Sequence, residues 1–167
     1  KVALVFPRVF WDQVDFLGHV GGKHHQTGGW ILFVDMSRVT RQPILVGMAG
    51  GPSALAVERL SDAEAVRRAM SVVRSLYPGA PDSVAARVTR WRADPYARGS
   101  FSFIPPGCSA AEYQVLSEPV CDTQGHPRVL FAGEATTRYH PSTVHGAWIT
   151  GVREAVRLDM HARPWLG

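Results

Sequence analysis

The residues best suited by type and spacing to form a ligand site lie near the end of the chain, in a Gly-Glu pair and a Ser/Thr pair. Gly133 and Glu134 end a short apolar run, 129–132, that is typical of a strand. After a proline, Ser142 and Thr143 are placed to cap a helix. Such a helix directs unpaired backbone N–H groups and a partial positive charge at whatever lies before Thr143. The spacing therefore predicts a site for an electron-rich or anionic ligand group.

These residues need a scaffold, and the chain offers both strands and helices for one. Short apolar runs bounded by Gly, Pro or polar residues predict strands of one sheet at 2–6, 30–35 and 44–49, with another at 84–91. Strands and helices are both expected, which predicts an α/β (α+β) fold.

The clearest helix signal is a capping box. Ser61 and Glu64 stand at capping-box spacing, and apolar residues follow at helical spacing until Pro78 and Gly79 stop the helix. We expect its apolar stripe to pack against the sheet. A second, short helix is expected at 109–116.

The helix that follows Thr143 has two faces of different character. Ala147, Gly151 and Ala155 recur every fourth residue and form a small-residue face that allows close packing against a neighbouring domain. The adjacent apolar stripe is expected in the core: Trp148, Val152 and Val156. Arg153 and Glu154 are expected to face solvent or to pair locally.

Composition and charge narrow the class of protein. The 167 residues are 46% hydrophobic and 19% charged, a globular composition, and every apolar stretch is broken before the ~18–20 residues that a bilayer needs. The net charge of +4 comes mostly from arginines that form no basic run, so the pattern does not favour nucleic-acid binding. The chain begins at Lys1, inside a strand-like run, and is expected to be a piece of a longer protein.

Cysteine and histidine usage does not predict a metal site. Cys108 and Cys121 lack Cys-x-x-Cys spacing, which favours a reduced intracellular protein over a structural zinc site. His24 and His25 are adjacent in a Gly-rich connection without a carboxylate or cysteine at ligand spacing, so a solvated loop is expected there.

The segment LFAGEATTRYHPSTVHGAWITGVREA, residues 130–155, resembles the flavin-contacting C-terminal segment of the FAD-dependent amine oxidases. Within that family it is most similar to lysine-specific histone demethylases and polyamine oxidases. Blocks at 1–6, 10–20 and 89–100 resemble the same family in the family's order. The resemblance implies a mixed-sheet substrate domain with flanking helices at 1–125, and the last strand and helix of a Rossmann-like FAD-binding domain at 126–167.

The resemblance also implies that FAD is the cofactor and that Gly133, Glu134, Thr143 and Val144 contact it. Glu134 has two interpretations: it accepts backbone N–H bonds, as acids near helix N-termini often do, or it lies beside the ribityl and pyrophosphate portion of FAD. The second is favoured because the preceding glycine permits close backbone approach. Thr143 and Val144 would bring the helix N-terminus to the pyrimidine edge of the flavin, where negative charge accumulates on reduction.

Four residues are predicted to line a substrate cavity: Trp91, Tyr96, Phe101 and Thr143. Composition alone would make the aromatic members anchors of a loop, but the resemblance implies that Phe101 is one wall of an aromatic cage for the amine. Tyr is commoner at that position in the demethylases. Thr143 is small and would leave room for a bulky substrate.

No catalytic residue is predicted within these 167 residues. In this family the G-x-G-x-x-G fingerprint and a lysine near the flavin belong upstream of Lys1, so the chain alone is expected to be inactive.

The implied reaction is oxidation of a C–N bond by hydride transfer to flavin, followed by imine hydrolysis and formation of hydrogen peroxide. A lysine-specific histone demethylase-like enzyme is favoured. A polyamine oxidase remains open because Tyr96 follows Asp94 and Pro95 and because Phe101 replaces Tyr, and a catalytically inactive interaction domain with the same fold remains open too.

The resemblance implies partners as well. They are an amine substrate (a methylated lysine of a histone tail or a polyamine), the N-terminal FAD-binding portion of the same protein, and chromatin corepressor proteins, with no membrane. The expected location is nuclear for a demethylase and otherwise cytoplasmic.

Overall fold

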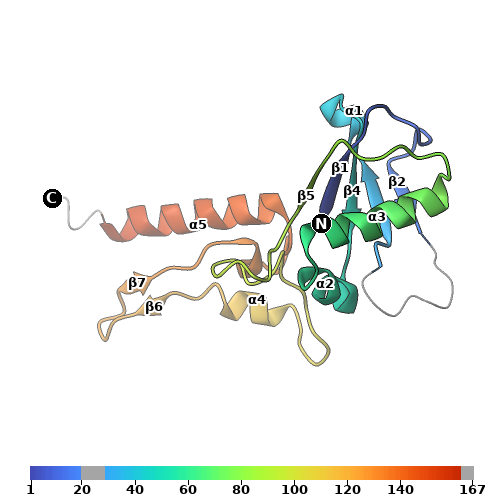
Figure 1. Cartoon of the computed structure of the whole chain (residues 1–167). Helices are drawn as coiled ribbons and strands as arrows, with labels where there is room; N and C mark the ends of the chain where they lie inside the picture. Colours follow the sequence, from blue (N-terminus) through green and yellow to red (C-terminus); the bar gives the residue numbers. More distant parts are fainter. Residues whose placement is uncertain (20–28, 163–167) are drawn as a thin grey trace. The chain divides into compact units, whose positions relative to one another are not determined.

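The computed structural model describes residues 1–19 and 29–162, and the chain divides into two compact units (Figure 1). Unit 1 is Lys1–Arg98 and unit 2 is Gly99–Gly167. The connection that carries His24 and His25 lies outside the described residues. The predicted domain boundary at 125/126 falls inside unit 2; because it concerns the domains of a longer protein, it stays a prediction.

Unit 1 is built on a sheet that confirms the strands expected from the apolar runs. Within the described residues its five strands lie in the order β2-β3-β4-β1-β5, and every pairing is antiparallel. The strands are β1 (Val2–Val5), β2 (Phe16–Gly18), β3 (Leu32–Asp35), β4 (Ile44–Met48) and β5 (Ala85–Val88). With the helices of both units, this sheet confirms the predicted α/β class.

The core of unit 1 lies between this sheet and α3 (Asp62–Leu76). The capping box is confirmed, because Ser61 Oγ accepts a hydrogen bond from Glu64 N at 3.2 Å. The predicted apolar stripe of α3 faces inward with Ala65, Ala69, Met70 and Val73 buried. Alternate strand residues point at them: Val2, Leu4, Leu17, Phe33 and Leu45.

Two short helices of unit 1 carry no strong signal in the sequence. They are α1 (Ser37–Thr40) and α2 (Gly51–Glu58). Pro52 lies in the first turn of α2, where its missing N–H costs no helical hydrogen bond. At the other end of α2, Arg90 donates to the carbonyl oxygens of Val57 (3.0 Å) and Leu60 (2.9 Å). A side chain from a distant segment thus satisfies the helix end.

Unit 2 contains α4 (Ala111–Val115), the hairpin β6 (Val120–Cys121) and β7 (Pro127–Val129), η1 (Glu134–Thr136), and α5 (Val144–Ala162). The short helix expected at 109–116 is confirmed as α4. The strand expected at 129–132 is wrong in its extent, since β7 ends at Val129. A strand needs a hydrogen-bonded neighbour, and the neighbour of β7 is the two-residue β6.

The packing of α5 reverses the expectation for its apolar stripe. Trp148, predicted to be in the core, is 74% exposed, and Val152 and Val156 are exposed as well. The helix buries a polar side instead, which includes Thr150 and Glu154. The expectation is wrong for these three residues because the segments that α5 contacts in unit 2 approach it from its polar side.

The described residues do not meet the requirements of a membrane-spanning helix or of a metal site. Among the described residues no helix combines the length and apolarity needed to span a membrane, and no three His, Cys, Asp or Glu side chains cluster as metal ligands would. Cys108 and Cys121 are both exposed and free of disulfides.

Candidate functional site

The predicted site of unit 2 is organised around the Glu134 carboxylate. Oε1 accepts a hydrogen bond from Ser102 N at 2.9 Å, and Oε2 accepts from Ser102 Oγ and from Ser142 N, both at 2.6 Å. Ser142 Oγ donates in turn to Ser102 O at 2.6 Å. The carboxylate therefore joins the loop that contains Phe101 to the loop that precedes α5. The interpretation of Glu134 as an acceptor of backbone N–H groups is confirmed, and its contact with FAD stays a prediction.

The protonation state of Glu134 follows from these contacts. Partial burial of the side chain acts to raise its pKa, since it disfavours the charged form. The hydrogen bonds from Ser102 and Ser142 outweigh burial, and the pKa of Glu134 lies below its ordinary value. The group is therefore a carboxylate at neutral pH, and as a carboxylate it only accepts hydrogen bonds.

The backbone conformation at position 133 requires a glycine. Its φ of 137° and ψ of 166° lie in a region essentially restricted to glycine, although a side chain there would meet no described atom within 4 Å. The turn is held by Thr150, a buried residue of α5 that the sequence analysis missed: Gly133 N donates to Thr150 Oγ1 at 2.9 Å. A threonine nearly two turns into an amphipathic helix gives no local signal of such a role.

Thr143 caps α5 as predicted. Its Oγ1 accepts a hydrogen bond from Gly146 N at 3.0 Å and donates to His140 O at 2.8 Å. The loop crosses so close to the helix that a Cβ on Gly146 would lie 2.0 Å from His140 O. The hydroxyl of Thr143 is fully engaged in holding the loop, so its contribution to a substrate cavity would be its small size.

The start of α5 offers a surface for a ligand. Val144 is 89% exposed, and the backbone N–H groups of Val144 and His145 have no acceptor among the described residues. Unpaired N–H groups at a helix N-terminus favour electron-rich ligand atoms. An exposed apolar side chain beside them suits a flat, largely apolar ring with a polar edge, so these residues fit a flavin.

The predicted cavity residues are divided between the two units. Phe101 belongs to unit 2 and is 58% exposed. Trp91 and Tyr96 belong to unit 1, and the Tyr96 side chain is 96% exposed. The backbone N–H of Tyr96 donates to Asp94 Oδ1 at 2.9 Å. That these aromatic residues and Thr143 line one cavity stays a prediction.

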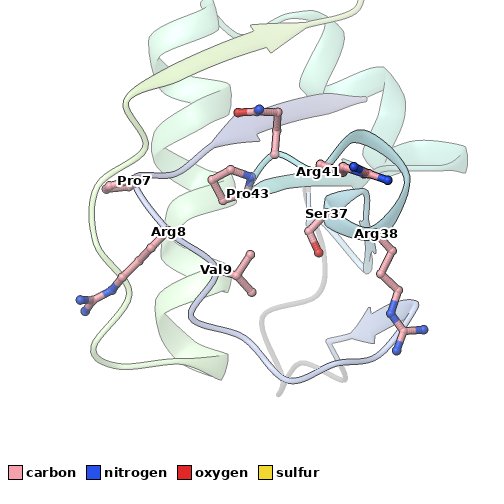
Figure 2. A pocket seen from close by; sticks show the side chains of 8 residues that line it. Pro7, Arg8, Val9, Ser37, Arg38, Arg41 and Pro43 are labelled. Carbon is pink, nitrogen blue, oxygen red and sulfur yellow. The ribbon is translucent and has the colours of Figure 1, made fainter.

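A hollow in unit 1 is lined by none of these residues. It has a volume of about 360 Å³ and is lined by Pro7, Arg8, Val9, Ser37, Arg38, Arg41, Gln42 and Pro43 (Figure 2). The Arg8 guanidinium extends to the opposite side of the hollow from those of Arg38 and Arg41. Arg38 is already paired with Asp15 at 3.3 Å. The arginines do not converge on one point, so the hollow is not organised to bind an anion.

Together the fold and the site define an α/β protein that supplies an exposed aromatic loop and a capped helix N-terminus suited to a cofactor ring. Comparison with known families identifies the class: the profile described as "Flavin containing amine oxidoreductase" matches residues 1–159. The chain belongs to this family of flavin-containing amine oxidoreductases.

Several named relatives are similar over almost the whole chain. "Possible lysine-specific histone demethylase 1" from Drosophila melanogaster is 40% identical over 166 residues, which cover 95% of this chain and 18% of that protein. "Lysine-specific histone demethylase 1 homolog 1" from Oryza sativa subsp. japonica is 39% identical over 168 residues, 98% of this chain and 19% of that protein. "Lysine-specific histone demethylase 1 homolog 3" from Arabidopsis thaliana is 41% identical over 161 residues, 95% of this chain and 10% of that protein. The chain thus spans a fifth or less of these relatives.

Proposed function

We propose that the chain is the part of an FAD-dependent, lysine-specific histone demethylase-like enzyme that supplies one wall of the substrate cavity and the helix facing the flavin. The observation that carries the proposal is the Glu134 network, which joins the Phe101 loop to the N-terminus of α5. Similarity to proteins named lysine-specific histone demethylases supports the substrate class. The proposed location is the nucleus.

In this proposal Gly133, Glu134, Thr143 and Val144 lie against FAD. The exposed Val144 side chain would pack on the ring, and the free N–H groups of the first turn of α5 would face its polar edge. When bound, FAD supplies the oxidising chemistry by accepting hydride from the carbon next to the amine nitrogen. The helix N-terminus would assist by stabilising negative charge at that edge.

The proposed role of Phe101 is to orient the amine and to keep water from it. Aromatic faces attract a cationic amine, and the apolar surroundings favour the neutral form from which hydride leaves. Trp91 and Tyr96 would extend the aromatic wall from unit 1. The substrate is then a methylated lysine of a histone tail.

The exposed apolar side of α5 supports a further part of the proposal. Trp148, Val152 and Val156 would be covered in the complete protein by its N-terminal FAD-binding portion, because a patch of this kind is unfavourable in water. We also propose the domain division at 125/126, on the resemblance of residues 126–167 to the last strand and helix of the FAD-binding domain. Chromatin corepressor proteins are proposed as further partners of the complete protein.

The test uses the full-length protein, purified with its flavin. Hydrogen peroxide is measured with a dimethyl-lysine histone-tail peptide and, separately, with spermine. We expect peroxide with the peptide; turnover of spermine alone would assign a polyamine oxidase, and turnover of neither would favour an inactive interaction domain.

A variant tests the proposed wall directly. Phe101→Ala should lower kcat/KM for the peptide by about tenfold to a hundredfold without loss of the flavin absorbance, because it removes a substrate contact and leaves the cofactor contacts. Phe103→Ala is the matched control, since Phe103 is an exposed aromatic residue on the same loop. Loss of flavin from Phe101→Ala alone would assign that residue to cofactor binding.

A further inference from the structure

Within the described residues, the loop that carries Phe101 is hydrogen-bonded to the rest of unit 2 through a single residue. Phe101, Phe103 and Ile104 are exposed, whereas Ser102 between them is partly buried. Among the described residues, the hydrogen bonds that hold 99–104 to other parts of unit 2 are all made by Ser102. An aromatic wall on this loop therefore depends on one serine for its position.

Ser102 uses both its backbone and its side chain for this attachment. The N–H and the hydroxyl group donate to the two oxygens of Glu134, at 2.9 and 2.6 Å, and the carbonyl oxygen accepts from Ser142 Oγ at 2.6 Å. The Tyr113 hydroxyl lies 3.1 Å from Ser102 Oγ, and Tyr113 is buried. Every polar atom of Ser102 thus has a partner within unit 2.

The other side of the network is under backbone strain. Ser142 has a φ of 61°, the left-handed region that non-glycine residues seldom occupy. Its N–H donates to Glu134 and its hydroxyl to Ser102 O, so both polar groups of the strained residue serve the same contact. Strain of this kind persists where surrounding interactions over-determine it.

We propose that Ser102 is a positioning residue that, through Glu134 and Ser142, fixes Phe101 relative to the first turn of α5. In this proposal Ser102 does not touch a reacting atom. It acts indirectly, because Phe101 and Thr143 are the chain neighbours of the two bonded serines. The inference deepens the proposed function and rests on it. It assigns to Ser102 and Ser142 roles that their residue types alone do not indicate.

The first test measures turnover in the full-length holoenzyme. Ser102→Ala should raise KM for the dimethyl-lysine peptide by roughly tenfold, the effect expected from one hydrogen bond to a charged group, with kcat within about twofold and an unchanged flavin spectrum. Ser102→Thr keeps the hydroxyl and should restore KM. Ser100→Ala is the control, because Ser100 is exposed on the same loop and forms no side-chain hydrogen bond with the described residues.

A second variant breaks the network from the opposite side. Ser142→Gly removes the hydroxyl group yet tolerates the positive φ, so it should raise KM as Ser102→Ala does. If one of the two variants folds poorly, the other still provides the test. An unchanged KM in both variants, or loss of flavin as the main effect, would overturn the proposal.

A third measurement does not depend on turnover. Hydrogen exchange at the Ser142 amide should accelerate by about tenfold or more in Ser102→Ala, although the two residues are 40 positions apart in the chain. If the wild-type protein oxidises no amine, the proposed function fails while the exchange result still decides whether the two loops are coupled. Unchanged exchange at Ser142 would reject the coupling itself.

Discussion

Different internal contacts stabilise each of the two units. Unit 1 buries a continuous apolar cluster between its sheet and α3. In the described part of unit 2 the buried residues are mainly polar: Ser117, Thr136, Thr150 and Glu154, with Tyr113 as the buried aromatic residue. Unit 1 therefore has an apolar core of its own. In unit 2 hydrogen bonds connect the segments, and the apolar side of α5 remains exposed.

The contacts of Arg153 illustrate how hydrogen bonds connect the segments of unit 2. Its guanidinium donates to Thr136 O at 2.8 Å and to Phe131 O at 2.9 Å, and these bonds connect α5 to the backbone of residues 131–136. Such bonds are directional and fix geometry, but each contributes little net stability. The hydrogen bonds within unit 2 therefore fix its shape, whereas its own contacts bury little apolar surface.

The largest expected difference in unfolding free energy comes from replacing one large side chain in each unit by alanine. Phe33→Ala, in the core of unit 1, should reduce the free energy of unfolding by about 3–5 kcal/mol. Trp148→Ala should change the 167-residue chain by less than about 0.5 kcal/mol, because the ring is already exposed. Urea unfolding measures both.

The same pair should behave differently in the full-length protein. There Trp148→Ala is expected to cost several times more than in the 167-residue chain, since the ring would be covered by the FAD-binding portion. Equal costs in both proteins would mean that unit 2 does not depend on a partner surface.

A smaller effect is expected where the loop before α5 crosses the helix. Gly146→Ala places a Cβ 2.0 Å from His140 O and should cost about 1–3 kcal/mol or displace the loop. Gly151→Ala is the control in the same helix, because a Cβ there meets nothing within 4 Å. It should leave the 167-residue chain unchanged or stabilise it by up to about 1 kcal/mol. Urea unfolding of the two variants is compared; similar losses would contradict the close crossing.

The hydrogen bond at the Gly133 turn should contribute less again. Thr150→Val keeps the shape of the side chain but leaves Gly133 N without its acceptor, which should cost about 1–2 kcal/mol. Thr150→Ser retains the hydroxyl and serves as the control. Thermal unfolding that ranks Thr150→Ser with Thr150→Val would show that packing, not the hydrogen bond, holds this turn.

The smallest effect concerns pH and isolates the Glu134 carboxylate. Because the pKa of Glu134 is lowered from its ordinary value of 4.5, the ionised group stabilises unit 2 above that pH, and this contribution is lost as the pH falls through the lowered pKa. Exchange at the Ser102 and Ser142 amides should therefore accelerate, beyond its intrinsic pH dependence, as the pH drops below 4.5.

Two variants separate Glu134 from other acids in that measurement. Glu134→Gln should remove the acid-dependent step, whereas Glu118→Gln should retain it, because Glu118 is exposed and has no side-chain partner among the described residues. A step that survives in Glu134→Gln would belong to a different group.

Much of the scaffold could be predicted from the sequence because its signals are local. The capping box at Ser61, the stop at Pro78 and the cap at Thr143 each depend on residues within one helical turn, and all agree with the structure. Apolar runs predicted the three central strands of unit 1 for the same reason. Local hydrogen bonding and side-chain periodicity are properties that a short stretch of chain carries by itself.

The side of α5 that is buried could not be predicted in this way. A 3.6-residue period shows that Trp148, Val152 and Val156 share one face, and the usual rule buries such a face. Whether it is buried depends on which segments lie beside the helix. In unit 2 those segments present backbone groups, so Thr150 and Arg153 face them and the apolar side remains exposed.

The sequence by itself determined the family and the main strands and helices, and it predicted four residues of the site: Gly133, Glu134, Thr143 and Phe101. Only the tertiary structure decided that Glu134 binds Ser102 and Ser142, which are 32 and 8 positions away along the chain. No periodicity or cap encodes a contact of that length, because it forms only when the intervening segments have folded and brought the two loops together. A serine is a common loop residue, and its partners become visible only in three dimensions.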